Sequence, residues 1–140
     1  MPPDRPTPEL IFYDGRCGLC HRWVRFVIKR DADGSRFRFA PQQGPTFENT
    51  ISDAFRSRLP DSVVVLTHDG RVLTKYAAAV HIMTRLGVAW RAVSVLARCV
   101  PGGVGDWVYD RIAAVRRRLF APPTDLCPVL PPALQDRFEQ

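Results

Sequence analysis

The sequence predicts one α/β domain built on a four-stranded mixed sheet with helices on both faces. Short apolar or alternating runs, typical of strands, are separated by stretches with helical periodicity. A turn signal, His68-Asp69-Gly70, joins the last two strand-like runs as a hairpin. The length of 140 residues suits a single domain that buries its core without covalent staples. The predicted order of elements is therefore β-α-β-α-β-β-α, followed by further helices.

The first strand and the first helix flank a turn. Residues 9–14 hold the apolar run of the strand, and Asp14-Gly15 breaks it. The helix is predicted from Gly18 to Lys29 or Arg30, and turn residues at 31–34 end it. Its helical spacing is carried by Leu19, Trp23, Phe26 and Val27.

The second strand is predicted at residues 36–40, where Phe37 and Phe39 alternate with charged residues. A short return through a helix implies a right-handed parallel crossover between the first two strands. After a loop at 41–45, a second helix is predicted, and Pro60-Asp61 ends it. Its apolar positions are Phe47, Ile51, Ala54, Phe55 and Leu59.

The β-branched run at 62–66 predicts a buried strand, and 71–74 is its hairpin partner. A third helix follows, and Gly87 ends it. Four strands in this order, with a Cys-x-x-Cys motif after the first strand, describe the small glutaredoxin-like version of the thioredoxin fold.

Two further helical patterns, at about 90–100 and 104–119, form a C-terminal extension that begins near residue 88. The first pattern is defined by Trp90, Val93, Leu96, Ala97 and Val100, and the second by Val104, Trp107, Val108, Ile112, Val115 and Leu119. The spacing places Trp90 and Trp107 toward the core. A proline-rich tail closes with a short predicted helix at 133–138, and residues 1–8 are expected to be a disordered leader. The thioredoxin-like domain with its extension then spans 9–140.

The pair Cys17 and Cys20 is the chemical centre of the sequence. The first turn of a helix has unpaired N–H groups and a partial positive charge, which stabilise a thiolate and lower the pKa of Cys17. Cys20 lies at i+3, on the same side of the helix, and can attack a mixed disulfide formed at Cys17. We therefore predict Cys17 as the nucleophile and Cys20 as the resolving thiol.

Asp14 is the third predicted catalytic residue, and Arg16, His21 and Ser62 are accessory candidates. Asp14 would raise the pKa of a nearby thiol, cap the helix or carry protons, and the sequence leaves these roles open. Arg16 and His21 add positive charge, and His21 could exchange protons with a thiol. Ser62 is placed where the thioredoxin fold puts its cis-proline, while Pro60 reads as a helix stop, so the isomer of the Leu59-Pro60 peptide stays undecided.

Other interpretations of the motif are weaker. A structural zinc site needs two more ligands, and neither Cys99 nor Cys127 has a Cys or His partner at zinc-finger spacing. The letters Cys-x-x-Cys-His also fit c-type haem attachment, which requires export, and residues 1–8 lack the apolar segment of a secretory signal. We expect no metal and no organic cofactor, with Cys99 buried in a helix and Cys127 as a candidate third redox thiol.

The net charge of +6 favours acidic partners, but the arginines are spread along the chain without the aromatic interleaving of single-strand binders, so no nucleic acid is expected. No apolar run reaches the length of a membrane span. Arg91 and Arg98 share one side of the 88–100 helix, which would suit a membrane surface or a partner, although a helix packed on the sheet is the ordinary interpretation. A reducing cytoplasm is the expected location.

Several segments together resemble the DCC family of predicted thiol–disulfide oxidoreductases. Its D-x-x-C-x-x-C signature matches Asp14, Cys17 and Cys20, and similar blocks follow in order at 37–40, 61–65, 109–113 and 119–120. The resemblance covers about 9–139 and implies a thioredoxin-like fold and protein-disulfide oxidoreductase activity. Lys75-Tyr76 stands where the family often has a Ser-Asp pair, which bears on substrate contacts.

The predicted function is thiol–disulfide exchange through the Cys17/Cys20 dithiol. The partners would be a protein disulfide or a small thiol such as glutathione. The alternatives are a metal- or haem-binding module and a non-catalytic interaction protein on the same fold. The direction of electron flow, the reducing partner and the oligomeric state do not follow from the sequence.

Overall fold

The computed structural model describes residues 7–15, 18–31, 34–59, 62–119 and 138. Their four strands are β1 (Glu9–Tyr13), β2 (Phe37–Pro41), β3 (Val64–Leu66) and β4 (Val72–Thr74). The sheet has the order β2-β1-β3-β4. Strand β1 runs parallel to β2 and antiparallel to β3, and β3 runs antiparallel to β4. The predicted four-stranded mixed sheet is thereby confirmed.

Strand β1 is central and almost completely buried because neighbours cover it on both edges and both faces. Its register with β2 pairs Glu9 with Phe37 and Tyr13 with Pro41. The carboxyl ends of these two parallel strands therefore meet at one edge of the sheet. The turn at Asp14 and the loop that begins at Gln42 leave from that edge.

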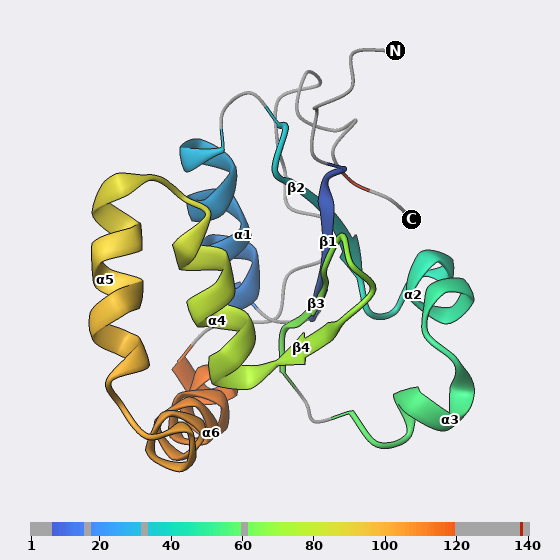
Figure 1. Ribbon diagram of the computed structural model, residues 1–140. Coiled ribbons are helices and arrows are strands. Elements are labelled where there is room, and N and C mark those ends of the chain that lie inside the picture. The colour runs from blue at the N-terminus through green and yellow to red at the C-terminus, as the bar shows by residue number, and fades with distance from the viewer. Residues whose placement is uncertain (1–6, 16–17, 32–33, 60–61, 120–137, 139–140) are drawn as a thin grey trace.

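Helices α1 (Gly18–Arg30) and α4 (Lys75–Thr84) cover one face of the sheet, and α2 (Pro45–Thr50) covers the other (Figure 1). Helices α5 (Val88–Arg98) and α6 (Gly102–Leu119) pack against α4, and α6 also touches α1. The extension thus adds an outer helical layer on the α4 side. Among the described helices, none has the length and apolar character needed to cross a membrane.

The core consists of two clusters separated by the sheet. The larger cluster lies under α1 and α4, and its buried members include Ile11, Tyr13, Val24, Val27, Phe37, Phe39, Val65, Ala78 and Ile82. The smaller cluster lies under α2 and consists of Phe12, Ala40, Phe47, Ile51 and Val64. The alternation of Ile11, Phe12 and Tyr13 between the clusters follows from the two-residue period of a strand.

The prediction of a single helix between Phe47 and Leu59 is wrong. The structure has α2 and a separate short helix, α3 (Asp53–Arg56). Between them Ile51 is extended, with φ −107° and ψ 123°, and its side chain is only 4% exposed. Burial of Ile51 against the sheet breaks the helical path, and Phe55, predicted to face inward, is 45% exposed.

The prediction of which side chains of the outer helices face the core is also wrong in part. In α5 the inner side consists of Trp90, Ser94 and Ala97, whereas Val93, Leu96 and Val100 are exposed. Trp107 of α6 is exposed, and so is Cys99, which was expected to be buried. A helix in an outer layer buries only the narrow strip that touches the layer beneath, so apolar periodicity does not identify its buried side.

Several predicted features lie outside the described residues: the leader at 1–6, the Leu59-Pro60 peptide, Cys127, and residues 133–137 of the last predicted helix. Phe138 is described. It forms an isolated parallel bridge with Phe39, and the two rings stack with centroids 5.5 Å apart. Phe138 thus extends the sheet beyond β2.

Candidate active site

The candidate site is the connection between β1 and α1. Asp14 and Gly15 follow the end of β1, and α1 begins at Gly18. Cys20 lies in the first turn of α1 and is half-buried. Arg16 and Cys17 lie outside the described residues, so the structure places Asp14, Cys20 and His21 of the residues predicted around the motif.

The N-terminus of α1 favours a negative charge. The helix is 13 residues long, has no acidic residue in its first turn, and carries Lys29 and Arg30 in its last turn. Unpaired N–H groups at the first turn and the macrodipole stabilise an anion there. Cys17 precedes the first helical residue directly in the sequence, so this end of α1 is suited to a thiolate.

Gln43, which follows β2, holds the turn between β1 and α1. Its side-chain oxygen accepts a hydrogen bond from the N–H of Gly15 at 2.9 Å. Its side-chain nitrogen donates to Oδ1 of Asp14, also at 2.9 Å. One amide thereby fixes both residues of the turn. The loop at 41–45 gave no sign of this role in the sequence, because the contact joins residues 28 and 29 positions apart.

His21 supports the same turn from the helix side. Its side chain is buried, at 6% exposed, and its Nε2 lies 2.8 Å from the carbonyl oxygen of Gly15. A carbonyl only accepts, so Nε2 carries the hydrogen and donates it. The ring of Tyr13 meets the imidazole edge to face, with centroids 5.7 Å apart. These contacts make His21 a positioning residue for the turn.

Ser62, the other accessory candidate that the structure describes, is buried at the entry to β3. Its Oγ accepts from the N–H of Lys75 at 3.3 Å and lies 3.2 Å from the carbonyl oxygen of Val63. Its own carbonyl oxygen accepts from the side chain of Gln42 at 2.6 Å. Through these hydrogen bonds Ser62 connects the start of β3 with the loop after β2 and with the start of α4, at the edge of the site.

A pocket of about 280 Å³ lies beside the motif. Its walls come from β1, α1, the start of β3, α4 and α6, and they are mostly apolar. The lining residues are Tyr13, Leu19, Cys20, Trp23, Val63, Ala79, Tyr109, Ile112 and Ala113. Cys20 is the reactive group among them, so an apolar group of a bound molecule could rest directly against the motif.

The sequence gave no role to Tyr109, which closes one side of this pocket. Its hydroxyl accepts a hydrogen bond from the backbone N–H of Val63 at 3.0 Å, across 46 positions of the chain. The predicted helix around Tyr109 was correct, but the partner could not be identified from spacing. The C-terminal extension thus supplies part of the candidate site.

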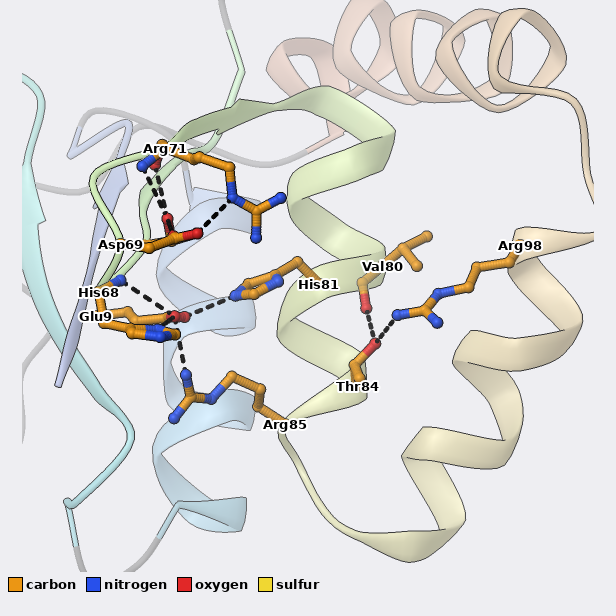
Figure 2. A network of polar contacts seen from close by, with 10 residues as sticks. Glu9, His68, Asp69, Arg71, Val80, His81, Thr84, Arg85 and Arg98 are labelled. Carbon is orange, nitrogen blue, oxygen red and sulfur yellow. Dashed lines mark hydrogen bonds and ion pairs between the residues drawn. The ribbon is translucent and has the colours of Figure 1, made fainter. Parts of the chain in front are cut away.

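A second polar cluster surrounds Glu9 at the opposite end of β1 (Figure 2). The Glu9 carboxylate is fully buried and lies 3.0 Å from Nδ1 of His68, 2.7 Å from Nε2 of His81 and 2.8 Å from a guanidinium nitrogen of Arg85. Burial alone would raise the pKa of Glu9. The hydrogen bonds from His68 and His81, with the charges of His81 and Arg85, outweigh burial and lower that pKa.

The Glu9 cluster is structural. Four residue steps along β1 separate it from Tyr13 at the pocket, a distance of about 13 Å. It joins β1, the turn before β4 and α4, and therefore fixes α4 on the sheet. The partner of His81 is 72 positions away in the chain, so local spacing in the sequence does not identify it. Within the described part of the chain, no three His, Cys, Asp or Glu side chains are grouped to hold a metal ion.

The comparisons with known proteins identify the family of the chain. A family model described as DCC1-like thiol-disulfide oxidoreductase matches residues 11–122. The chain is 36% identical over 134 residues to the protein of Bacillus subtilis named "Uncharacterized protein YuxK", covering 93% of each chain. It is also 29% identical over 112 residues to "DCC family protein At1g52590, chloroplastic" of Arabidopsis thaliana, covering 79% of this chain and 64% of that protein. No solved structure matches significantly. The chain belongs to the DCC1-like thiol-disulfide oxidoreductase family.

Proposed function

We propose that the protein exchanges disulfides through a dithiol formed by Cys17 and Cys20. The observation that carries the proposal is the position of Cys20, in the first turn of α1 and on the wall of the apolar pocket. The turn that precedes the motif is fixed from two sides, by Gln43 and His21. Such fixation of the strand–helix junction is what a reactive thiol at a helix start requires.

The exchange proceeds in two steps. The Cys17 thiolate attacks one sulfur of a substrate disulfide, a bond forms between them, and the other substrate sulfur leaves as a thiolate. The Cys20 thiolate then attacks Sγ of Cys17 and releases the second substrate sulfur. Two electrons pass to the substrate, whose sulfurs take up two protons, and the protein is left with a Cys17–Cys20 disulfide. A small thiol of the glutathione class would reduce it again.

The pocket favours substrates with an apolar group next to the disulfide. Trp23, Val63 and Ile112 offer such a group a surface beside Cys20. A peptide disulfide flanked by aliphatic or aromatic residues would therefore react faster than one flanked by charged residues. Reduced surroundings, such as the cytoplasm, would keep the dithiol ready for reduction of substrates.

The haem alternative is less well supported. In a Cys-x-x-Cys-His attachment site the histidine ring must turn to the iron. Here the ring of His21 is buried between Tyr13 and Gly15, and Nε2 already donates to a carbonyl oxygen. Binding of haem iron by His21 would require the turn to open.

The test is the alkylation rate of each cysteine against pH, followed by mass spectrometry on the reduced full-length chain. We expect Cys17 to react far faster than Cys99 and to titrate well below the ordinary thiol pKa of about 8.5. In exchange assays with an apolar peptide disulfide, Cys17→Ser should be inactive. Cys20→Ser should accumulate a mixed disulfide on Cys17.

Cys99→Ser is the matched control, because Cys99 is an exposed cysteine on the outer layer, away from the pocket lining. It should exchange disulfides at the wild-type rate. Equal and slow alkylation of Cys17 and Cys99, or equal loss of exchange in Cys17→Ser and Cys99→Ser, would contradict the proposal.

A further inference from the structure

The outward side of α5 is apolar. Val88 is 84% exposed and Leu96 71%, and Val93, Val95 and Val100 are exposed as well. At 100° per residue the side chains of Val88, Val93, Val95 and Leu96 occupy one broad arc of the helix. The fully buried Ser94 lies on the opposite side, and its hydroxyl donates to the carbonyl oxygen of Arg91 at 2.7 Å. A water-facing helix would show the reverse distribution.

Helix α6, the next element in the chain, also exposes apolar side chains. Trp107 is 58% exposed, and Val104, Val108, Ile112 and Val115 are exposed too. Helices α5 and α6 follow each other in the chain and both lie outside α4, at the side of the molecule remote from α2 and α3 (Figure 1). We call the exposed apolar side chains of α5 and α6, with Val100 between them, the α5–α6 face. Scattered apolar residues are ordinary, but a concentration over two neighbouring helices marks an interaction surface.

The charges around the α5–α6 face select its partner. Helix α5 contains no acidic residue. Its charged residues, Arg91 and Arg98, are exposed and lie on one flank of the apolar arc, where Arg98 also donates to the hydroxyl of Thr84 in α4 at 3.4 Å. The guanidinium of Arg111 lies 5.0 Å from the ring centroid of Trp107. The surroundings of the apolar surface are therefore cationic, with an arginine placed over its exposed tryptophan.

The acidic residues of α6 in its described part are engaged on the α4 side. Asp110 forms an ion pair with Lys75 at 3.1 Å. Asp106 accepts from the backbone N–H of Tyr76 at 3.4 Å. Because these two carboxylates are paired on the α4 side, they do not neutralise the arginines beside the α5–α6 face. The net charge of +6 for the whole chain acts in the same direction.

A second copy of the chain is a less suitable partner for the α5–α6 face than an anionic surface. A two-fold contact puts the same surface of both copies against each other. Arg91 and Arg98 of each copy would then lie near their counterparts, and α5 offers no carboxylate to neutralise them. Aliphatic side chains, a tryptophan and arginines without acids are instead the composition that binds the interface of an anionic lipid bilayer.

We propose that the α5–α6 face docks on the surface of an anionic membrane. Helix α5 lies in the headgroup layer with Leu96 and Val95 toward the acyl chains, and Arg91 and Arg98 bind lipid phosphates. Ile112 belongs both to this face and to the pocket wall, so docking brings the pocket close to the bilayer. Binding itself does not depend on the thiol chemistry, and Cys20→Ser is expected to bind vesicles as wild type does.

The experiment is co-sedimentation of the full-length chain with vesicles of phosphatidylcholine alone or mixed with phosphatidylglycerol. Wild type should bind the mixed vesicles, release them at high salt, and bind phosphatidylcholine much more weakly. Leu96→Glu should abolish binding. Arg91→Gln with Arg98→Gln should weaken it by on the order of fivefold for each arginine, the effect of one basic residue near an anionic surface. Trp107 fluorescence should shift to the blue, and Trp107→Phe should lose most of that shift.

Phe55→Ser is the matched control. It removes an exposed apolar side chain, 45% exposed against 71% for Leu96, from α3, which is remote from the α5–α6 face (Figure 1). It should bind vesicles as wild type does, and circular dichroism should show that all variants are folded. Absence of vesicle binding by wild type, or equal loss in Phe55→Ser, overturns the proposal. So does a vesicle-free dimer that Leu96→Glu dissociates, because the α5–α6 face would then be occupied by a second copy.

Discussion

The hydroxyl of Tyr109 accepts a hydrogen bond from the backbone N–H of Val63, and this contact joins α6 to the start of β3. Both residues line the pocket beside Cys20. The outer layer of helices is therefore part of the site, because without α6 one wall of the pocket and the partner of a strand N–H would be missing. The contact leads to the first prediction.

Tyr109→Phe should lower the free energy of unfolding by about 1 kcal/mol, the usual contribution of one hydrogen bond. The ring that lines the pocket remains, so the exchange rate with an apolar peptide disulfide should change little. Tyr109→Ala removes the ring as well and should lower both stability and exchange rate further. Urea unfolding and the exchange assay measure the two effects. Unchanged stability in Tyr109→Phe would show that water replaces the hydroxyl at no cost.

Gln43→Ala should slow disulfide exchange about tenfold, because Asp14 and Gly15 lose the amide that fixes the turn before the motif. Gln43→Glu tests the mechanism more closely. A glutamate can still accept from the N–H of Gly15, but it cannot donate to Asp14, and its charge repels that carboxylate. We therefore expect Gln43→Glu to slow exchange at least as much as Gln43→Ala does.

The control for Gln43 is Gln42→Ala. Gln42 donates to the carbonyl oxygens of Phe12 and Ser62 and touches neither residue of the turn in these contacts. Its loss should lower stability while the exchange rate is retained. If both variants slow exchange equally, the effect of Gln43 is general destabilisation of the loop and not positioning of the turn.

Glu9→Gln should lower the free energy of unfolding at neutral pH by about 3 kcal/mol, because His81 and Arg85 lose a buried charged partner. The folded state lowers the pKa of Glu9 below its ordinary value of 4.5. Its contribution to stability is therefore fully present above pH 4.5 and disappears as the pH falls through the lower pKa of the folded state. The difference in stability between wild type and Glu9→Gln should narrow on acidification below pH 4.5.

Urea titrations at a series of pH values measure this difference. Glu48→Gln is the matched control, because it removes the same charge from an exposed position on α2. It should leave stability almost unchanged at neutral pH. A difference between wild type and Glu9→Gln that stays constant far below pH 4.5 would mean that Glu9 acts through packing and not through its charge.

The order of strands and inner helices could be predicted from the sequence because each depends on local periodicity. A stretch of about twenty residues predicted three consecutive elements, and the structure confirms all three. They are the strand at Leu10–Tyr13, the turn at Asp14 and the helix that begins at Gly18. Contacts between distant positions could not be read in this way. The bond of Gln43 to the turn and that of Tyr109 to Val63 depend on how the sheet and α6 fold back.

The outer helices show a second limit. Apolar spacing predicted Trp107 in the core and made Leu96 part of the apolar pattern of its helix, and both are exposed. Periodicity in the sequence indicates that a helix has an apolar side. Which side chains become buried depends on the layer against which the helix packs. In α5 that inner strip uses Trp90, the buried Ser94 and Ala97, whose carbonyl oxygen accepts from the hydroxyl of Tyr76 at 2.6 Å.

Gly105→Ala should destabilise the protein although alanine is the better helix former. Gly105 is buried in α6, and a Cβ at this position would overlap the ring of Tyr76. Tyr76 cannot move away easily, since its hydroxyl donates to the carbonyl oxygen of Ala97 and its N–H donates to Asp106. Overpacking of this kind costs about 1–3 kcal/mol, which exceeds the gain of up to about 1 kcal/mol from helix propensity.

Gly103→Ala is the matched control in the same helix. Nothing lies within 4 Å of a Cβ built at Gly103, so only the propensity term acts and the variant should be slightly more stable than wild type. Urea unfolding compares the two. Because α6 carries Tyr109 and Ile112, displacement of α6 in Gly105→Ala should also slow the reaction of apolar peptide disulfides. If Gly105→Ala gains as much stability as Gly103→Ala, then α6 does not pack closely on Tyr76. The position of α6 as a wall of the pocket would then be contradicted.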